Sequence, residues 1–119
     1  MSGLRDELEL PRVYLRAALL VLVAEGPTHG YELLEGVRAF GVRSDAGGLY
    51  RLLRTLEQTG LLRSWWEDSS SGPPRRTYEL TDEGRRAFAQ EIDNVRAHAH
   101  LLSNLVLHAE TTAAASARR

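Results

Sequence analysis

The chain has 119 residues, of which 43% are hydrophobic and 26% charged, as expected for one soluble globular domain. The absence of cysteine excludes a disulfide framework and thiolate metal sites, and the absence of an apolar run of about 18 residues excludes a membrane span. The net charge of −1 gives no indication of nucleic-acid binding. We therefore expect a cytoplasmic protein with no membrane partner.

Two helices are predicted in the first 40 residues, after a short helix or arm over residues 1–10. Pro11 can begin the first of them, because the first helical position needs no N–H donor, and Gly26-Pro27 ends it. Thr28 is predicted to cap the second helix, which ends near Phe40. Its predicted buried face consists of Tyr31, Leu34, Val37 and Phe40.

The third predicted helix begins at Ser44, which we expect to be its N-cap, and ends at Gly60. One apolar stripe at helical spacing is formed by Leu49, Leu52, Leu53 and Leu56. Gly47 and Gly48 lie in its first turn, where each costs roughly 0.5–1 kcal/mol relative to alanine. A side chain at Gly47, on the outward face, would hold the helix away from a binding partner. Gly48 is expected nearer the flank, where threonine should be tolerated.

A hairpin is predicted beyond Gly60, with strands over residues 61–67 and 75–80 and a loop over residues 68–74. Trp65 and Trp66 are adjacent on the first strand, so their side chains point to opposite faces. We expect one of them to be in the core and the other to be half-exposed or to line a cavity.

A long helix is predicted from a cap at Thr81 to Glu110, followed by a frayed tail over residues 111–119. An unbroken heptad seam runs along it: Phe88, Ile92, Val95, Ala99, Leu102, Val106 and Ala109. A lone helix of this length needs a partner surface. We expect the seam to form a homodimer with help from the first helix. The alternative is that it packs on the chain's own first helix.

Three helices followed by a hairpin are the order of elements in a winged helix-turn-helix. The predicted fold is therefore mainly α, with a β-hairpin wing and a long C-terminal dimerisation helix. Residues 1–80 would form the DNA-binding domain, residues 81–110 the dimerisation helix and residues 111–119 a flexible tail. A recognition helix places its N-terminal residues against base edges in a major groove. Its outward face here holds Gly47, Arg51, Arg54 and Gln58, with Tyr50 at the flank.

Three motifs in register resemble the PadR-like transcriptional regulators: "GPTHGYELLEGV", "GGLYRLLRTLEQTGLL" and "WEDSSSGPPRRTYELTDEGRRAF". The resemblance covers roughly residues 15–90 and implies a dimeric winged-helix repressor, often released from its operator by a small molecule. It also implies that the third helix and the wing contact DNA, and that this chain has the short form with a single C-terminal helix. The family commonly has a threonine where this chain has Gly48.

We predict a homodimeric, sequence-specific transcriptional regulator that binds a palindromic double-stranded DNA operator and is a repressor released by an effector. The residues predicted to contact DNA are Ser44, Gly47, Gly48, Tyr50, Arg51, Arg54, Arg75 and Arg76. The alternative is a winged-helix protein-interaction module that no longer binds DNA. The net charge and Gly48 favour this alternative, whereas the arginines on the expected DNA side oppose it.

The effector is expected to be an apolar or aromatic small molecule that binds near the dimer interface, with Trp65 and Trp66 as candidate pocket residues. His98, His100 and His108 do not share one helix face, so we expect surface histidines and predict no metal site; the alternative is a site built across a dimer. The chain has no P-loop and no Gly-x-Ser-x-Gly motif, so we expect neither a cofactor nor enzyme activity.

Overall fold

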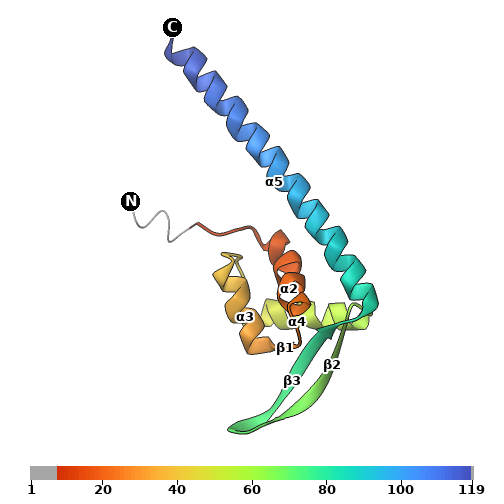
Figure 1. The fold of residues 1–119 in the computed structure, drawn as a ribbon. Helices are drawn as coiled ribbons and strands as arrows, with labels where there is room; N and C mark the ends of the chain where they lie inside the picture. The colour runs from red at the N-terminus through yellow and green to blue at the C-terminus, as the bar shows by residue number, and fades with distance from the viewer. Residues whose placement is uncertain (1–7, 119) are drawn as a thin grey trace.

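Residues 8–118 are described by the structure, a computed structural model. A 3-10 turn, η1 (Arg12–Tyr14), leads into α2 (Leu15–Ala24), which is followed by β1 (Thr28–His29) and α3 (Gly30–Ala39). The chain continues through α4 (Ala46–Gln58), the strands β2 (Leu62–Ser69) and β3 (Gly72–Leu80), and α5 (Asp82–Ala117). Helices α2, α3 and α4 form a bundle, the β2–β3 hairpin extends below it, and α5 projects away from it (Figure 1). The arm expected over residues 1–10 lies largely outside the described residues; within them, Leu10 bridges to Val42.

The core lies between the three helices of the bundle and the base of the hairpin. Its fully buried side chains include Leu19, Leu20, Leu33, Leu49, Leu53, Leu56 and Leu80. The apolar stripe predicted for α4 is confirmed at Leu49, Leu53 and Leu56, while Leu52 is only partly buried. Apolar surface removed from water in this way is the main source of stability for a domain of this size.

The buried face of α3 begins one position earlier than the predicted face. Gly30, Leu33 and Val37 are buried, whereas Tyr31 is 70% exposed and Phe40 is 47% exposed. The spacing 30, 33, 37 is as helical as the expected 31, 34, 37. The choice between these two faces is decided by a close contact at Gly30, where an added Cβ would lie 2.6 Å from the Tyr50 ring. Gly30 therefore has to face α4, and Tyr31 turns outward.

Two predicted helix caps are wrong. Thr28 does not cap α3, because Thr28 and His29 form β1 and pair with Tyr78 and Thr77 of β3. Ser44 does not cap α4, because the N-cap is Asp45, whose Oδ1 accepts a hydrogen bond from the Gly48 N–H at 2.7 Å. The predicted cap at Thr81 is confirmed, since its hydroxyl accepts a hydrogen bond from the Gly84 N–H at 3.0 Å.

The three strands form one antiparallel sheet in the order β1-β3-β2. Most of the loop predicted over residues 68–74 is strand, and only Ser70 and Ser71 lie between β2 and β3. Pro73 and Pro74 fit within β3 because β1 pairs only with its base, so one edge of β3 is free at the prolines. The expectation that one tryptophan is in the core is wrong. Both lie in β2, with Trp65 half-buried and Trp66 exposed.

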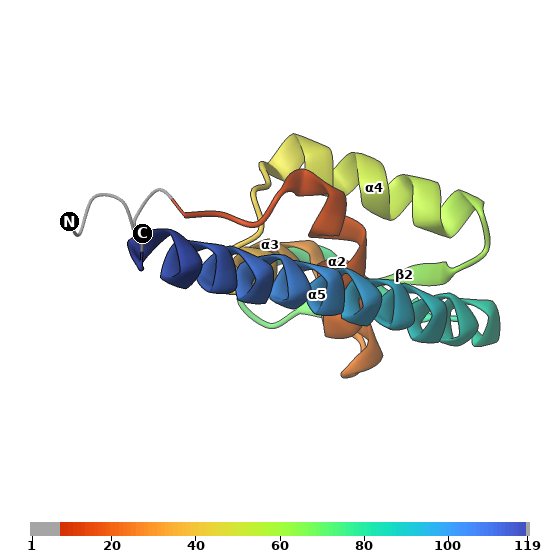
Figure 2. The same cartoon turned by 90° about the horizontal axis from the view of Figure 1, so that it is seen from above.

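Helix α5 runs on well beyond the bundle as a single rod (Figures 1 and 2). It ends at Ala117, seven residues beyond the predicted end at Glu110, so it includes most of the segment predicted to be a tail. The run "TTAAASA" is rich in alanine, the residue with the highest helix propensity, which explains the extension. Gly84 is needed at its start, because a Cβ there would collide with the Leu61 carbonyl. No helix within residues 8–118 is long and apolar enough to cross a membrane.

Candidate nucleic-acid interface

The exposed face of α4 is the one predicted to face DNA. Gly47, Tyr50, Arg51, Arg54 and Gln58 are all exposed, whereas the leucines on the opposite side are buried. Neither Arg51 nor Arg54 has an ion-pair partner within the part of the chain that the structure describes. Arginine side chains in this position can bond guanine edges or phosphates.

The two adjacent glycines of α4 have different surroundings. Gly47 is open to solvent, and an added Cβ would meet only the flexible end of Arg51, at 3.3 Å. Gly48 is buried, and a Cβ there would collide with the Arg12 guanidinium and lie 2.8 Å from Asp45 Oδ1. The expectation that Gly48 lies at an open flank is therefore wrong, and a threonine at this position would have to displace Arg12 and strain the helix cap.

The surroundings of the α4 cap stabilise the ionised form of Asp45. The hydrogen bond from the Gly48 N–H, with a smaller contribution from the Arg12 and Arg51 charges, holds the pKa of Asp45 below its ordinary value. A carboxylate at this end of α4 is also favoured by the helix dipole. Ser44 only donates to the Asp45 carbonyl, at 3.1 Å, and is half-buried.

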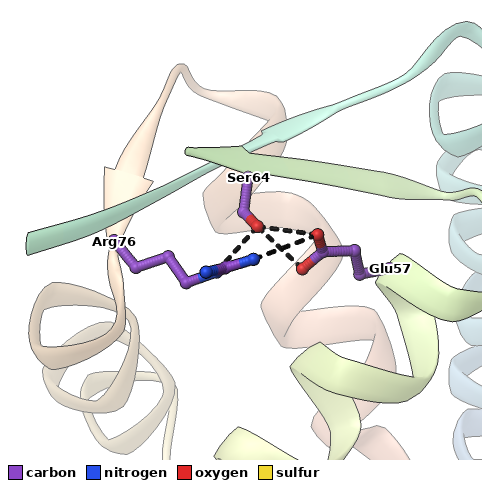
Figure 3. Close-up of polar contacts among 3 residues, drawn as sticks. All are labelled: Glu57, Ser64 and Arg76. Atoms are coloured by element: carbon purple, nitrogen blue, oxygen red, sulfur yellow. Dashed lines mark hydrogen bonds and ion pairs between the residues drawn. The ribbon is translucent and has the colours of Figure 1, made fainter. Parts of the chain in front are cut away.

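The two wing arginines differ in their contacts. Arg75 is exposed at the cross-strand position opposite Glu67, whose carboxylate accepts a hydrogen bond from the Trp65 indole at 3.0 Å. Arg76 instead turns back toward α4, as Figure 3 shows. Its Nε donates to Ser64 Oγ at 2.8 Å, and its Nη2 lies 3.4 Å from Glu57 Oε2.

Glu57 and Ser64 complete this contact. Ser64 Oγ lies 2.8 and 2.7 Å from the two Glu57 carboxylate oxygens, so its hydroxyl donates to the carboxylate while accepting from Arg76 (Figure 3). The Arg76 guanidinium also lies 5.4 Å from the centroid of the Trp66 ring, a cation–π arrangement. Sequence analysis did not find Glu57 or Ser64, because only the register of the hairpin against α4 brings them together.

A recess of about 390 Å³ separates α4 from the wing. Its lining residues are His29, Gly30, Tyr31, Tyr50, Trp66, Arg75, Arg76 and Tyr78. No carboxylate is among them, and the Tyr78 phenol, whose pKa is raised by burial, is a hydrogen-bond donor. The recess therefore offers cationic, aromatic and hydrogen-bond-donating groups on the same side as the exposed face of α4. The sequence did not indicate that His29 and Tyr31 belong to this surface.

Comparison with known proteins decides the family. Residues 19–90 match the model of the "Transcriptional regulator PadR-like family". The chain belongs to this family. The members of the PadR-like family are transcription regulators, not enzymes; they bind DNA and are typically dimeric. The winged-helix fold and the long C-terminal helix predicted from the sequence are confirmed.

Relatives of this PadR-like regulator span most of its length. It is 34% identical over 83 residues to the transcriptional regulator Rv3488 of Mycobacterium tuberculosis, covering 70% of this chain and 77% of that one. A PadR family regulator from Eggerthella lenta is 36% identical, with a TM-score of 0.63 and coverage of 88% and 87% of the two chains. The protein smu.1704 from Streptococcus mutans shares the fold, with a TM-score of 0.76 at 19% identity and coverage of 84% and 92%.

A second hollow of this PadR-like regulator lies away from α4 and the wing. It has a volume of about 440 Å³ and is formed by α2, the end of α3 and α5. Its lining is almost entirely apolar and includes Tyr14, Ala18, Phe40, Ile92 and Leu102. Neither Trp65 nor Trp66 lines it, so the candidate pocket residues lie on the wing and not in this groove.

The heptad seam of α5 is divided between two environments. Phe88, Ile92 and Val95 are half-buried, and Phe88 packs against the core. Beyond them the seam is exposed at Ala99, Leu102 and Val106. The alternative of packing on the chain's own first helix therefore describes only the first part of the seam. Within residues 8–118, no group of three or more His, Asp or Glu side chains is arranged to hold a metal ion.

Proposed function

We propose that this PadR-like regulator is a homodimeric repressor that binds a palindromic operator, with α4 in the major groove and the wing on the backbone. The observation that carries the proposal is the exposed face of α4. It presents Arg51 and Arg54 to solvent, with the Arg51 guanidinium beside Gly47, next to a recess whose lining has no carboxylate. Exposed cationic side chains on one helix face suit contact with phosphates and base edges.

The unpartnered part of α5 supports dimerisation. Leu101 and Leu105 are both 65% exposed and lie beside the exposed end of the heptad seam. Leucines this exposed along several helical turns lose their apolar contact with water when a second copy covers them. A two-fold dimer in turn places two recognition helices on a palindromic site.

The apolar groove supports release by an effector. A planar apolar compound in it would touch both α2 and α5, so it would change the angle between the bundle and the dimerisation helix. That angle sets the distance between the two α4 helices, and a ligand that prefers one angle shifts the DNA affinity. Such compounds should raise the melting temperature and change the operator affinity without quenching either tryptophan. A screen in which no compound changes either quantity contradicts this part of the proposal.

The test of DNA binding is a fluorescence-anisotropy titration of the protein with fragments of its own upstream region, repeated over a range of salt concentrations. One fragment should bind much more tightly than the others, and its log Kd should depend linearly on log salt. Replacing Arg51 and Arg54 by alanine should weaken binding and reduce the slope. Arg96→Ala, on the exposed side of α5, is the matched control and should leave both unchanged.

The protein-interaction alternative predicts no fragment preference and no salt-dependent binding. For the repressor, a reporter under the bound fragment should be expressed more strongly in cells that lack the protein. Lower expression in those cells would identify an activator.

A further inference from the structure

The contact between Arg76, Ser64 and Glu57 joins the wing to the recognition helix (Figure 3). We propose that Glu57 is a positioning residue for DNA recognition: through Ser64 and Arg76 it fixes the angle of the wing relative to α4. The proposal rests on the proposed function, because it concerns how this chain would hold its two DNA-facing elements in register.

The location of the contact allows it to control the angle of the wing relative to α4. Glu57 lies in the last turn of α4, while Ser64 and Arg76 lie on the two strands of the hairpin. The covalent link between α4 and β2 is a short turn with Gly60 at φ +83°. The sheet ties the hairpin to the bundle through β1 only at Thr77 and Tyr78. The hairpin is also anchored by Leu62, Tyr78 and Leu80, which are buried in the core. In the part of the chain that the structure describes, the three side chains add a polar link between α4 and the hairpin where it leaves the bundle.

A small rotation at this link moves the tip of the wing considerably. Ser69 lies five residues beyond Ser64, which is about 17 Å along the strand at ~3.3 Å per residue. A rotation of about 10° at Ser64 would thus displace the tip by about 3 Å. Such a displacement is the length of a hydrogen bond, enough to separate a wing side chain from its phosphate.

The chemistry of the three groups favours a fixed geometry. The Ser64 hydroxyl uses its single proton on the carboxylate and a lone pair on Arg76 Nε, so each group has a defined partner. The Trp66 ring holds the guanidinium plane from another side. The Arg76 guanidinium is thereby occupied by contacts within the protein. Of the two wing arginines, Arg75 is the one free to bind a phosphate.

This assignment separates two roles that would look alike in a simple binding assay. Arg76→Gln should weaken operator binding because the wing is no longer held, and it should leave the salt slope within about half a unit of the parent. A residue that binds a phosphate directly would instead lower the slope by about 0.9. Glu57→Gln removes a negative charge, so pure electrostatics would strengthen binding, whereas loss of positioning weakens it.

The experiment measures operator and unrelated DNA with the full chain and its Glu57→Gln, Arg76→Gln and double variants. Each single variant should lose at least fivefold in operator affinity, and the double variant should lose no more than the larger single loss. Binding to unrelated DNA by Glu57→Gln should be equal or slightly tighter. The matched control is Glu79→Gln, which makes the same charge change in the Arg63–Glu79 pair within the hairpin and does not touch α4. It should bind like the parent.

A second measurement needs no DNA. The chain has no cysteine, so Thr55→Cys and Ser70→Cys place one spin label on α4 and one at the wing tip. With labelled protein diluted in unlabelled protein, the distance distribution should be narrow in the parent and broad in Glu57→Gln and Ser64→Ala.

An unchanged distribution in Glu57→Gln overturns the proposal, as does a slope reduced by about one unit in Arg76→Gln. If the parent binds no DNA, the proposed function fails. If the parent binds and Glu57→Gln behaves like Glu79→Gln, only the positioning role fails.

Discussion

Replacing Gly47 by leucine should separate the stability of α4 from its binding to DNA. The Cβ of the new side chain would lie 3.3 Å from Arg51 Nη1, the end of a flexible side chain, and would meet no other side chain outside its chain neighbours within 4 Å. Removing a helical glycine without a clash should stabilise the fold by up to about 0.5–1 kcal/mol. For a domain of this size, that raises the melting temperature by about 2–5 °C.

The same leucine stands between the first turn of α4 and any partner on the exposed face. It would cover the bare N-terminal backbone and displace Arg51 from its place beside it. We expect operator affinity to fall at least tenfold, a loss of about 1.4 kcal/mol. Thermal melts followed by circular dichroism give the first quantity, and anisotropy titration with operator DNA gives the second.

Gly48→Ala is the control for the stability argument, in comparison with Gly47→Ala. Both changes remove one helical glycine, but the Cβ at position 48 collides with Arg12 and crowds the Asp45 cap. Gly47→Ala should therefore melt at a higher temperature than the parent, and Gly48→Ala should not. Operator binding by Gly47→Leu at the affinity of the parent would refute the assignment of this face to DNA. Equal stabilisation by the two alanines would refute the crowding at Gly48.

Three further predictions address the dimer, the wing and the cap of α4. Leu105→Glu, on the exposed part of α5, should give a folded monomer by sedimentation velocity because it places a charge in an apolar contact, and a dimer of unchanged strength would contradict the assignment. Arg75→Ala should weaken binding to all DNA sequences and lower the salt slope by about one unit, and an unchanged slope would remove Arg75 from the backbone contact. The pKa of Asp45 is lower in the folded protein than in the unfolded chain. The contribution of this carboxylate to the free energy of unfolding is therefore fully present above the unfolded pKa and is lost as the pH falls through the folded pKa. Between about pH 5 and pH 2, the melting temperature should thus fall more for the parent than for Asp45→Asn, and equal falls would contradict the role of the carboxylate.

Helices with a strong periodic pattern of apolar residues were predictable from the sequence. The exposed face of α4 was predictable for the same reason. The leucine stripe of α4 fixes which side of that helix is buried, so Arg51 and Arg54 had to face outward. The cap at Thr81 and the long α5 follow from local preferences in the same way.

What could not be predicted depends on contacts between elements distant in the sequence. The strand β1 has two residues, too few for any periodic pattern, and it exists only because β3 offers an edge. The face of α3 was misassigned because the deciding contact, Gly30 against Tyr50, joins two helices. Arg76 had an equally good local reason to face DNA, and only the register of the hairpin against α4 turns it toward Glu57.

The pairing of β1 with β3 imposes an order on folding. It joins Thr28 to Tyr78, about 50 residues apart, and the loop that it closes contains all of α3, α4 and β2. Closing so long a loop is entropically costly unless the segments inside it are already compact. The β2–β3 hairpin and the pair of helices α3 and α4 should therefore form first, and the β1 contact last. In native-state hydrogen exchange, the amides that join β1 to β3 should then exchange at a lower free energy of opening than the amides of α3 and α4, so the base of the wing should open before the helices of the bundle do.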